Sequence, residues 1–441
     1  MNVNERILNA HVTKTLDEAL LELSLYKDGK LVASGDGKLS VSADGRLQLE
    51  MDADTIPFNN SDPALRGAII PDKEFCEIKA TTRDNLTFKA NKLFAETISS
   101  HIDKPAHAHF EPGQVTLLSP VSPQLYSSFD VFMAPFECDF FNRHCADGET
   151  NPVFGDNVSG QWLLVETAEI AIGLRKESDL WIHFKVKSKT AGASNMEKYA
   201  VAFLNALRFH VGMYLEFLAY SHTSAEGDEI ILTNHKLNNG RQFFRPLPKH
   251  EPQATEKLLL CGMDFFLKGA CSPVITALRV CWESRKVIFP ANYLLVCSVV
   301  EGLADYILKD AENQLKKLQS ELLVSIDSHQ SDKNCSYLKR VKEVVKKEDL
   351  FKDAEKTRKA ADWLKITITD NESKALNMLR NPLAHGNFHL DAESKAEIQI
   401  KLDQAACVAN IVNKFVLGLF RYEGVFRNYS MRGYPTCNFP A

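Results

Sequence analysis

The apolar residues of this chain follow two different periods on either side of Pro252. Before Pro252, short runs of alternating apolar and polar residues are bounded by turn residues, which is typical of β-strands. After it, apolar residues recur at helical spacing, which is typical of amphipathic helices. Because a run with one period does not readily form the other element, we expect a β-rich region followed by a helical region.

The clearest strand signals lie between Leu20 and Met51, where Lys27-Asp28-Gly29, Gly35-Asp36-Gly37 and Ala43-Asp44-Gly45 separate apolar runs. Asp-Gly between alternating apolar residues predicts hairpins. Further strands are expected at Phe75–Ala80, Asn85–Ala90, Val115–Leu118, Phe129–Met133, Gly160–Arg175, Leu180–Lys187 and Glu229–Leu232. We expect a sandwich or two packed sheets, with one helix over Glu197–Phe217.

The predicted fold class is therefore α+β, with sandwich-like sheets plus a helix over 1–252 and an all-α bundle over 253–426. Residues 427–441 are assigned to a tail, and a break near 190–225 would divide the first half in two. The expected helices are Glu256–Lys268, Pro273–Glu283, Ala291–Leu323, Cys335–Lys347, Asp353–Leu364, Glu372–Arg380 and Ala392–Tyr422.

The composition excludes some classes of protein. A net charge of −5 does not fit a generally basic nucleic-acid coating protein, so any RNA site must be a local patch. The ten cysteines include no CxxC pair, and neither a signal peptide nor an uninterrupted apolar run of transmembrane length is evident. These features predict a cytoplasmic protein that has reduced thiols and no membrane partner.

The segment from Leu379 to Gly386 carries the residues best suited to chemistry, Arg380 and His385. Histidine can move protons near neutral pH, and arginine offers a fixed fork of donors to a phosphate that is gaining charge. In RNA the attacking group can be the substrate's own 2′-hydroxyl, so this pair requires no metal in principle. The same spacing in Arg245 and His250 falls in a proline-rich linker without helical pattern, and we interpret it as accidental.

The residues between the pair predict a helix break. Pro382 disfavours an uninterrupted helix and biases Asn381 away from helical dihedrals, while Asn-Pro is a good N-cap and first-turn pair. We therefore expect one helix to end near Arg380 and a short turn to begin at Asn381, which would aim both side chains into one cleft.

A helical domain with Arg380-Asn381 and His385 late in its sequence resembles the HEPN superfamily, whose nuclease members use an Arg-x4–6-His motif. The run from Leu295 to Leu303, with Glu301 embedded in it, looks like the early HEPN helix whose acidic residue supports the active site. The run Val416–Val425 looks like the end of the HEPN domain in ApeA-type antiphage proteins. The resemblance covers the second half by motif and the first half by architecture only.

The resemblance implies a metal-independent endoribonuclease without a cofactor, with Arg380 and His385 catalytic and Asn381 and Glu301 supporting. It also implies a homodimer or higher oligomer through the helical domain, RNA such as tRNA as substrate, and a role in abortive infection, with a phage-derived trigger bound by the N-terminal region. The alternative is an inactive HEPN module for dimerisation or ligand binding, in which His385 caps a turn and Arg380 pairs with a carboxylate. The sequence is equally consistent with Asn381 having only an N-cap role, and with Glu301 being one member of a structural ion pair.

Other clusters have simpler interpretations. His101, His107 and His109 with Cys138, His144 and Cys145 lack the close spacing of zinc ligands, so no metal is predicted. Cys261, Cys271 and Cys281 lie on apolar helix faces and read as core residues. The lysine-rich stretch from Lys333 to Lys359 is interleaved with acids, which favours a solvated helix face over an RNA-binding patch.

Overall fold

The computed structural model describes residues 3–54, 75–93, 95–101, 104–119, 128–137, 140–146, 149–157, 159–177, 181–190, 195–224, 227–234, 242–269, 271–287, 291–328, 340–343, 353–384 and 395–440. The chain forms two compact units: unit 1 is Met1–Leu204 with Leu215–Asn239, and unit 2 is Asn205–Tyr214 with Gly240–Ala441. The α+β class is confirmed, since a large antiparallel sheet occupies the N-terminal half and helices the C-terminal half.

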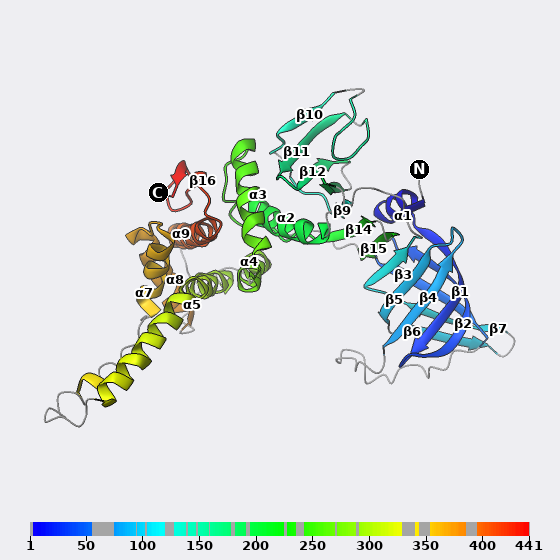
Figure 1. The fold of residues 1–441 in the computed structure, drawn as a ribbon, viewed down its shortest axis with the longest axis horizontal. Helices are drawn as coiled ribbons and strands as arrows, with labels where there is room; N and C mark the ends of the chain where they lie inside the picture. Colours follow the sequence, from blue (N-terminus) through cyan, green and yellow to red (C-terminus); the bar gives the residue numbers. More distant parts are fainter. Residues whose placement is uncertain are drawn as a thin grey trace. The chain divides into compact units, whose positions relative to one another are not determined.

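The described strands of unit 1, drawn as arrows in Figure 1, are hydrogen-bonded into one sheet rather than into the two packed sheets expected. Its 15 strands run in the order β10-β11-β12-β13-β9-β14-β15-β8-β5-β4-β1-β2-β3-β7-β6. They are β1 (Asp17–Lys27), β2 (Lys30–Val41), β3 (Leu47–Ala53), β4 (Cys76–Thr82), β5 (Thr87–Leu93), β6 (Ala95–His101), β7 (Lys104–Phe110), β8 (Gln114–Leu118), β9 (Ser128–Met133), β10 (Arg143–Cys145), β11 (Gly160–Glu166), β12 (Ile170–Lys176), β13 (Ile182–Ser188), β14 (Phe217–Ser224) and β15 (Gly227–Thr233).

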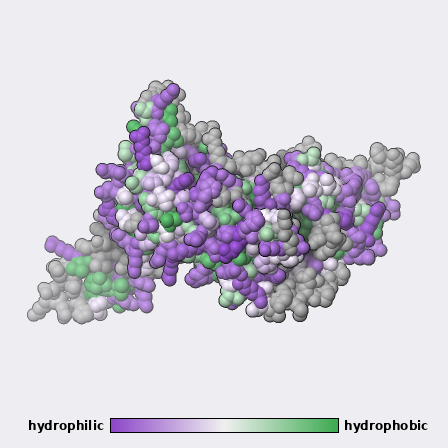
Figure 2. Space-filling model, turned by 90° about the horizontal axis from the view of Figure 1, so that it is seen from above, coloured by the Kyte–Doolittle hydropathy of each residue, from purple (hydrophilic) through white to green (hydrophobic). Residues whose placement is uncertain are grey.

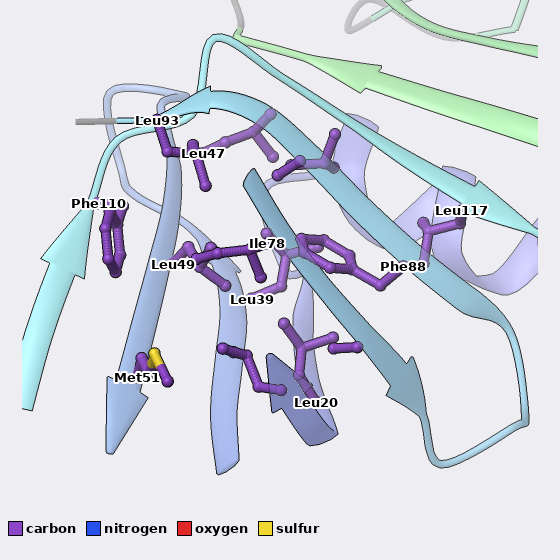
Figure 3. Close-up of a cluster of buried hydrophobic side chains, with 14 of the residues drawn as sticks. Leu20, Leu39, Leu47, Leu49, Met51, Ile78, Phe88, Leu93, Phe110 and Leu117 are labelled. Atoms are coloured by element: carbon purple, nitrogen blue, oxygen red, sulfur yellow. The ribbon is translucent and has the colours of Figure 1, made fainter. Parts of the chain in front are cut away.

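The largest core of unit 1 follows from the alternation of apolar residues in these strands. In β3, Leu47, Leu49 and Met51 are fully buried and the residues between them are not. Figure 3 shows these side chains pointing toward others from the neighbouring strands, among them Phe88 and Phe110. Burying such a side chain stabilises the fold by roughly 1.5–3 kcal/mol. A helix that the sequence analysis did not predict, α1 (Val3–Val12), adds Ile7 and Leu8 to this core.

The predicted turn at Gly35-Asp36-Gly37 is wrong, because these residues lie inside β2. Both glycines pair with β3, and a Cβ at Gly35 would lie 1.8 Å from the backbone oxygen of Asp52. A Cβ at Gly37 would lie 2.4 Å from the backbone oxygen of Glu50. The glycines therefore permit a close approach of two strands, which is the other common role of glycine in sheets.

The helix expected over Glu197–Phe217 is shorter in the structure. Helix α2 spans Met196–Val211, and Phe217 begins β14. Gly212 follows the helix with φ +70°, a left-handed conformation that favours glycine at a helix C-terminus. The apolar pattern continues past this stop signal, which explains why periodicity alone extended the helix too far.

Unit 2 contains most of the helices that the sequence predicts. They are α3 (Pro252–Leu267), α4 (Ser272–Ser284), α5 (Ala291–Ser328), α7 (Asp353–Leu364), α8 (Asp370–Ala384) and α9 (Lys395–Leu419). Helix α5 contacts α4, α7, α8 and α9, and the second half of α9 is almost entirely buried. Residues 340–343 are helical, whereas the rest of the expected Cys335–Lys347 helix lies outside the described residues.

The C-terminal residues of unit 2 correct the expectation of an all-α region with a tail. Strands β16 (Gly424–Arg427) and β17 (Thr436–Phe439) form an antiparallel hairpin. The hairpin is attached to the segment before α3, because the Arg427 amide donates to Pro246 O at 2.8 Å and the Tyr429 hydroxyl to Arg245 O at 2.8 Å.

One part of α5, Ala291–Lys309, is long and apolar enough to cross a membrane, although 56% of its hydrophobic window is buried within the structure. Packing against neighbouring helices accounts for this apolar character, so the segment is weak evidence for a membrane span. The face seen in Figure 2 is largely hydrophilic, with smaller apolar areas between the polar residues.

Candidate functional site

The structure brings two of the four predicted site residues together. Glu301 on α5 and Arg380 on α8 form an ion pair, with 2.6 Å between Glu301 Oε1 and Arg380 Nε. Their side chains are 41% and 35% exposed, so a ligand can reach the pair from solvent. At this exposure the pair itself contributes little stability, on the order of 0–1 kcal/mol.

The helix around Arg380 differs from the expectation of a break at Asn381-Pro382. Helix α8 continues through both residues to Ala384. Pro382 removes one backbone donor, but it lies in the last turn, where a lost hydrogen bond affects little further helix. The side chain of Asn381 and all of His385 lie outside the described residues, so their predicted roles stay predictions. In sequence, His385 directly follows the last residue of α8.

Helix α8 is held in place by its buried face and its first turn. Ala375, Leu376 and Leu379 are buried, as their helical spacing predicts. At the N-terminus the backbone amide of Thr369 donates to Glu372 Oε2 at 2.7 Å, and the Glu372 amide donates to Thr369 Oγ1 at 3.2 Å. This reciprocal arrangement is a capping box, and its Thr-x-x-Glu spacing was readable in the sequence.

Glu372 is also one half of a buried ion pair that ties α8 to α9. Its side chain is 0% exposed, and Lys414 Nζ lies 3.0 Å from each of its carboxylate oxygens. Asn410 Nδ2 donates to Glu372 Oε1 at 2.7 Å, and Lys414 Nζ also donates to Thr367 O at 2.9 Å. Asn410 Oδ1 in turn accepts from the Tyr429 amide at 3.0 Å. This network links α8, α9 and the C-terminal hairpin.

Cys297, one helical turn before Glu301, is buried close enough to the pair for both charges to act on the pKa of its thiol. Burial, reinforced by the charge of Glu301, raises the pKa of its thiol to about 12, and Arg380 only partly offsets the effect. The thiol is therefore protonated at neutral pH and is not a nucleophile. Sequence analysis did not single out Cys297, although its position on the apolar face of α5 was visible.

The remaining sequence candidates do not add to this site. Among the described residues, no group of three histidine, cysteine or acidic residues is placed to hold a metal ion. Cys138 lies outside the described residues, and His107 pairs with Asp52 at 2.9 Å on the surface of the sheet. Cys271 and Cys281 are buried, and Cys261 partly so, as expected for core residues.

The described part of the lysine-rich stretch makes ion pairs. Lys342 pairs with Asp327 and Lys356 with Asp305, while Arg358 lies 3.2 Å from Asp370. Lys359 and Glu355 form a pair one helical turn apart on α7. These contacts agree with the interpretation as a solvated helix face.

A second charged cluster, in unit 1, was missed by sequence analysis. His183 on β13 lies between two carboxylates, 2.9 Å from Asp130 Oδ1 and 3.2 Å from Glu177 Oε1. Burial lowers the pKa of His183, but its hydrogen bonds and the charges of both acids outweigh this and raise it. Burial raises the pKa of Asp130, but Lys185 and His183 bring it down to about 2. The two carboxylates therefore favour the charged form of the His183 imidazole.

No protein-family model, curated protein or solved structure matches this chain. The interpretation of the site therefore depends on its own geometry and on the motif.

Proposed function

We propose that the chain is a metal-independent endoribonuclease of the HEPN type, with Arg380 and His385 as catalytic residues. The observation that supports the proposal is the Glu301–Arg380 pair. An arginine is fixed at a solvent-accessible surface of the helical unit, on the helix that ends one residue before His385 in the sequence. A guanidinium held in one orientation by a carboxylate is pre-organised for a phosphate.

In the proposed reaction the 2′-hydroxyl of one ribose attacks the adjacent phosphate. His385 acts as general base or acid, and Arg380 stabilises the dianionic phosphorane. The products carry a 2′,3′-cyclic phosphate and a 5′-hydroxyl. No metal takes part, so activity is expected to persist in EDTA.

The proposed setting is cytoplasmic antiphage defence by abortive infection, with RNA such as tRNA as the substrate. The active form would be a homodimer or higher oligomer of the helical unit. Uncontrolled cleavage would kill the host, so unit 1 is proposed to bind a phage-derived trigger and restrain unit 2.

The test is incubation of the purified full-length protein with total RNA and a tRNA pool in EDTA, followed by mapping of product ends. Wild type is expected to leave cyclic phosphate ends, and Arg380→Gln and His385→Ala are expected to lose cleavage. Lys374→Gln is the matched control, because it removes a positive charge from an exposed position on the same helix. Cleavage by His385→Ala at the wild-type rate would refute the mechanism.

Glu301→Gln separates a positioning role from a structural one. Because the pair is largely solvated, loss of the Glu301 charge should change the free energy of unfolding by less than about 1 kcal/mol. If Glu301 orients Arg380, cleavage should nevertheless slow while the pH profile set by His385 is retained. An unchanged rate would remove Glu301 from the proposed site.

The same ion pair also favours a second candidate function. An Arg380 already neutralised by Glu301 is what the inactive HEPN module requires, with the helical unit serving dimerisation or ligand binding and the β-rich half serving as recognition surface. Intact RNA in the cleavage assay, both alone and in phage-infected lysate, together with a stable dimer, would favour this alternative.

A further inference from the structure

Three arginines from separate segments of unit 2 gather around an aromatic cluster at the C-terminal hairpin. Arg245 precedes α3, Arg285 follows α4, and Arg427 ends β16. The rings of Phe244 and Tyr429 are 4.8 Å apart at 71°.

A third ring and one guanidinium complete the cluster. Tyr429 and Tyr434 have their ring centroids 5.0 Å apart, and the guanidinium of Arg285 lies 5.7 Å from the Phe244 ring centroid. Residues far apart in the sequence thus form one compact group, which we call the arginine–tyrosine cluster.

The positive charges of the three arginines act on the hydroxyl groups of two tyrosines. The Tyr429 hydroxyl is close enough to Arg427 and Arg245 for both charges to act on its pKa, and it hydrogen-bonds Arg427. Arg285 acts in the same way on Tyr293, in the first turn of α5, and Tyr434 interacts with both tyrosines. Each of the three arginine charges therefore lies near the hydroxyl of Tyr293 or Tyr429.

Two of these charges, those of Arg285 and Arg427, have no compensating carboxylate among the described residues. Burial raises the pKa of both Tyr293 and Tyr429, so neither is a phenolate at neutral pH. Within the described ranges, neither Arg285 nor Arg427 forms an ion pair with a carboxylate, and the buried Nε of each has no hydrogen-bond partner there.

The lack of a carboxylate partner for Arg285 and Arg427 contrasts with the pairing of another arginine in this chain. Arg175 in unit 1 makes a bidentate pair with Asp156, with both nitrogen–oxygen distances 2.6 Å, and also pairs with Glu177. The buried part of a guanidinium is ordinarily paired in this way, because an uncompensated buried charge is costly. An anionic partner is therefore the simplest complement to the arginine–tyrosine cluster.

Part of the cluster is accessible to solvent. Arg285 and Arg427 are only partly buried, and Tyr434, in the turn between β16 and β17, is 41% exposed. Guanidinium forks match phosphate oxygens, and an exposed aromatic face stacks well with a nucleobase.

We propose that the arginine–tyrosine cluster binds a nucleoside phosphate, with the phosphate held by Arg285 and Arg427 and the base placed against Tyr434. The nucleoside phosphate can be a free nucleotide or one unit of an RNA strand. Tyr293 and Glu301 lie eight residues apart on α5, about 12 Å along its axis, so a strand can reach both places. The binding site does not require nuclease activity.

The test titrates the full-length protein at fixed ionic strength with three probes: inorganic phosphate, a set of mononucleotides, and a short single-stranded oligonucleotide with 2′-O-methyl riboses. The methyl group blocks the proposed cleavage, so binding is measured whether or not the protein is a nuclease. Saturable binding of mononucleotides is expected if the ligand is free, and of the oligonucleotide alone if the ligand is a strand.

Arg285→Gln and Arg427→Gln should each weaken this binding by roughly ten-fold or more, as expected for loss of a charge-assisted hydrogen bond. Lys286→Gln is the matched control, because it removes a positive charge from the adjacent, exposed residue and should leave affinity unchanged. Tyr434→Ala should remove the preference for nucleotides over inorganic phosphate.

Three results would overturn the proposal: no saturable binding of any probe, affinity unaffected by Arg285→Gln, or neither the mononucleotides nor the oligonucleotide binding more tightly than inorganic phosphate. Circular dichroism of each variant checks folding. If Arg427→Gln does not fold, Arg285→Gln decides, because Arg285 is partly exposed and its buried Nε has no hydrogen-bond partner among the described residues, so this variant should fold.

Discussion

Removal of one partner from the buried Glu372–Lys414 pair should destabilise unit 2 far more than removal of an exposed pair. The two side chains are 0% and 4% exposed, so solvent cannot compensate the remaining charge. Loss of one member of such a pair typically costs about 3–5 kcal/mol. The other hydrogen-bond partners of each side chain indicate whether loss of Glu372 or loss of Lys414 destabilises unit 2 more.

Lys414→Met leaves the carboxylate with three donors, from Asn410 and from the amide and hydroxyl of Thr369. Glu372→Gln keeps one side-chain oxygen and the Thr367 carbonyl for the ammonium but removes its counter-charge, and it turns an amide donor toward groups that are themselves donors. We therefore expect Glu372→Gln near the upper end of that range and Lys414→Met near the lower end.

The assay is urea unfolding followed by hydrogen exchange of peptides from α8 and α9, because a chain with two units need not unfold in one transition. The double variant Glu372→Gln/Lys414→Met should be less destabilised than the sum of the single variants, since it leaves no unpaired charge. Additive effects, or a cost below about 1 kcal/mol for Lys414→Met, would refute the reasoning.

Three further predictions concern individual residues. The raised pKa of His183 gives unit 1 stability that is fully present below the unfolded-state pKa of about 6.5 and lost as pH rises through the higher folded-state pKa. The hydrogen-exchange protection factors of β9 and β13, which are corrected for the intrinsic pH dependence of exchange, should therefore fall on the alkaline side in wild type but not in His183→Gln. Gly35→Ala should destabilise unit 1 by about 1–3 kcal/mol through overpacking, whereas Gly113→Ala, where a Cβ meets nothing within 4 Å, should not; equal melting temperatures would contradict this. Cys297, with a pKa of about 12, should resist alkylation in the native state while the partly exposed Cys437 reacts, and rapid labelling of Cys297 would show that α5 opens.

Helices were predicted more accurately than strands because their signals are local. The helical period and the flanking residues located α4, α5 and α7 within a few residues, and proline at the start of α3 and α4 agrees with the usual first-turn preference. The sheet order could not be predicted, because a glycine pair marks either a turn or a close approach of strands, and only the partner strand decides between them.

The candidate site was predictable only in part. The embedded Glu301 and the Arg380 motif were visible in the sequence, and their 2.6 Å contact joins residues on different helices that no local pattern relates. The arginine–tyrosine cluster was not visible at all. Arg245 was read as an accidental copy of the motif, and its neighbours Arg285 and Arg427 come from segments without any shared pattern.

The attachment of the C-terminal hairpin has a consequence for the order in which the protein is made. Asn410 bonds both Glu372 and the Tyr429 amide, so the network that fixes α8 is completed only when residues 428–430 are available. Synthesis proceeds at roughly 5–20 residues per second, and domains generally fold as their last segments emerge from the ribosome. The helix that carries Arg380 therefore reaches its final position only after α9 and the C-terminal hairpin have been translated. A chain that stops before the hairpin would lack the hydrogen bond from the Tyr429 amide to Asn410. In the full chain, formation of the site has to wait until the hairpin has been synthesised.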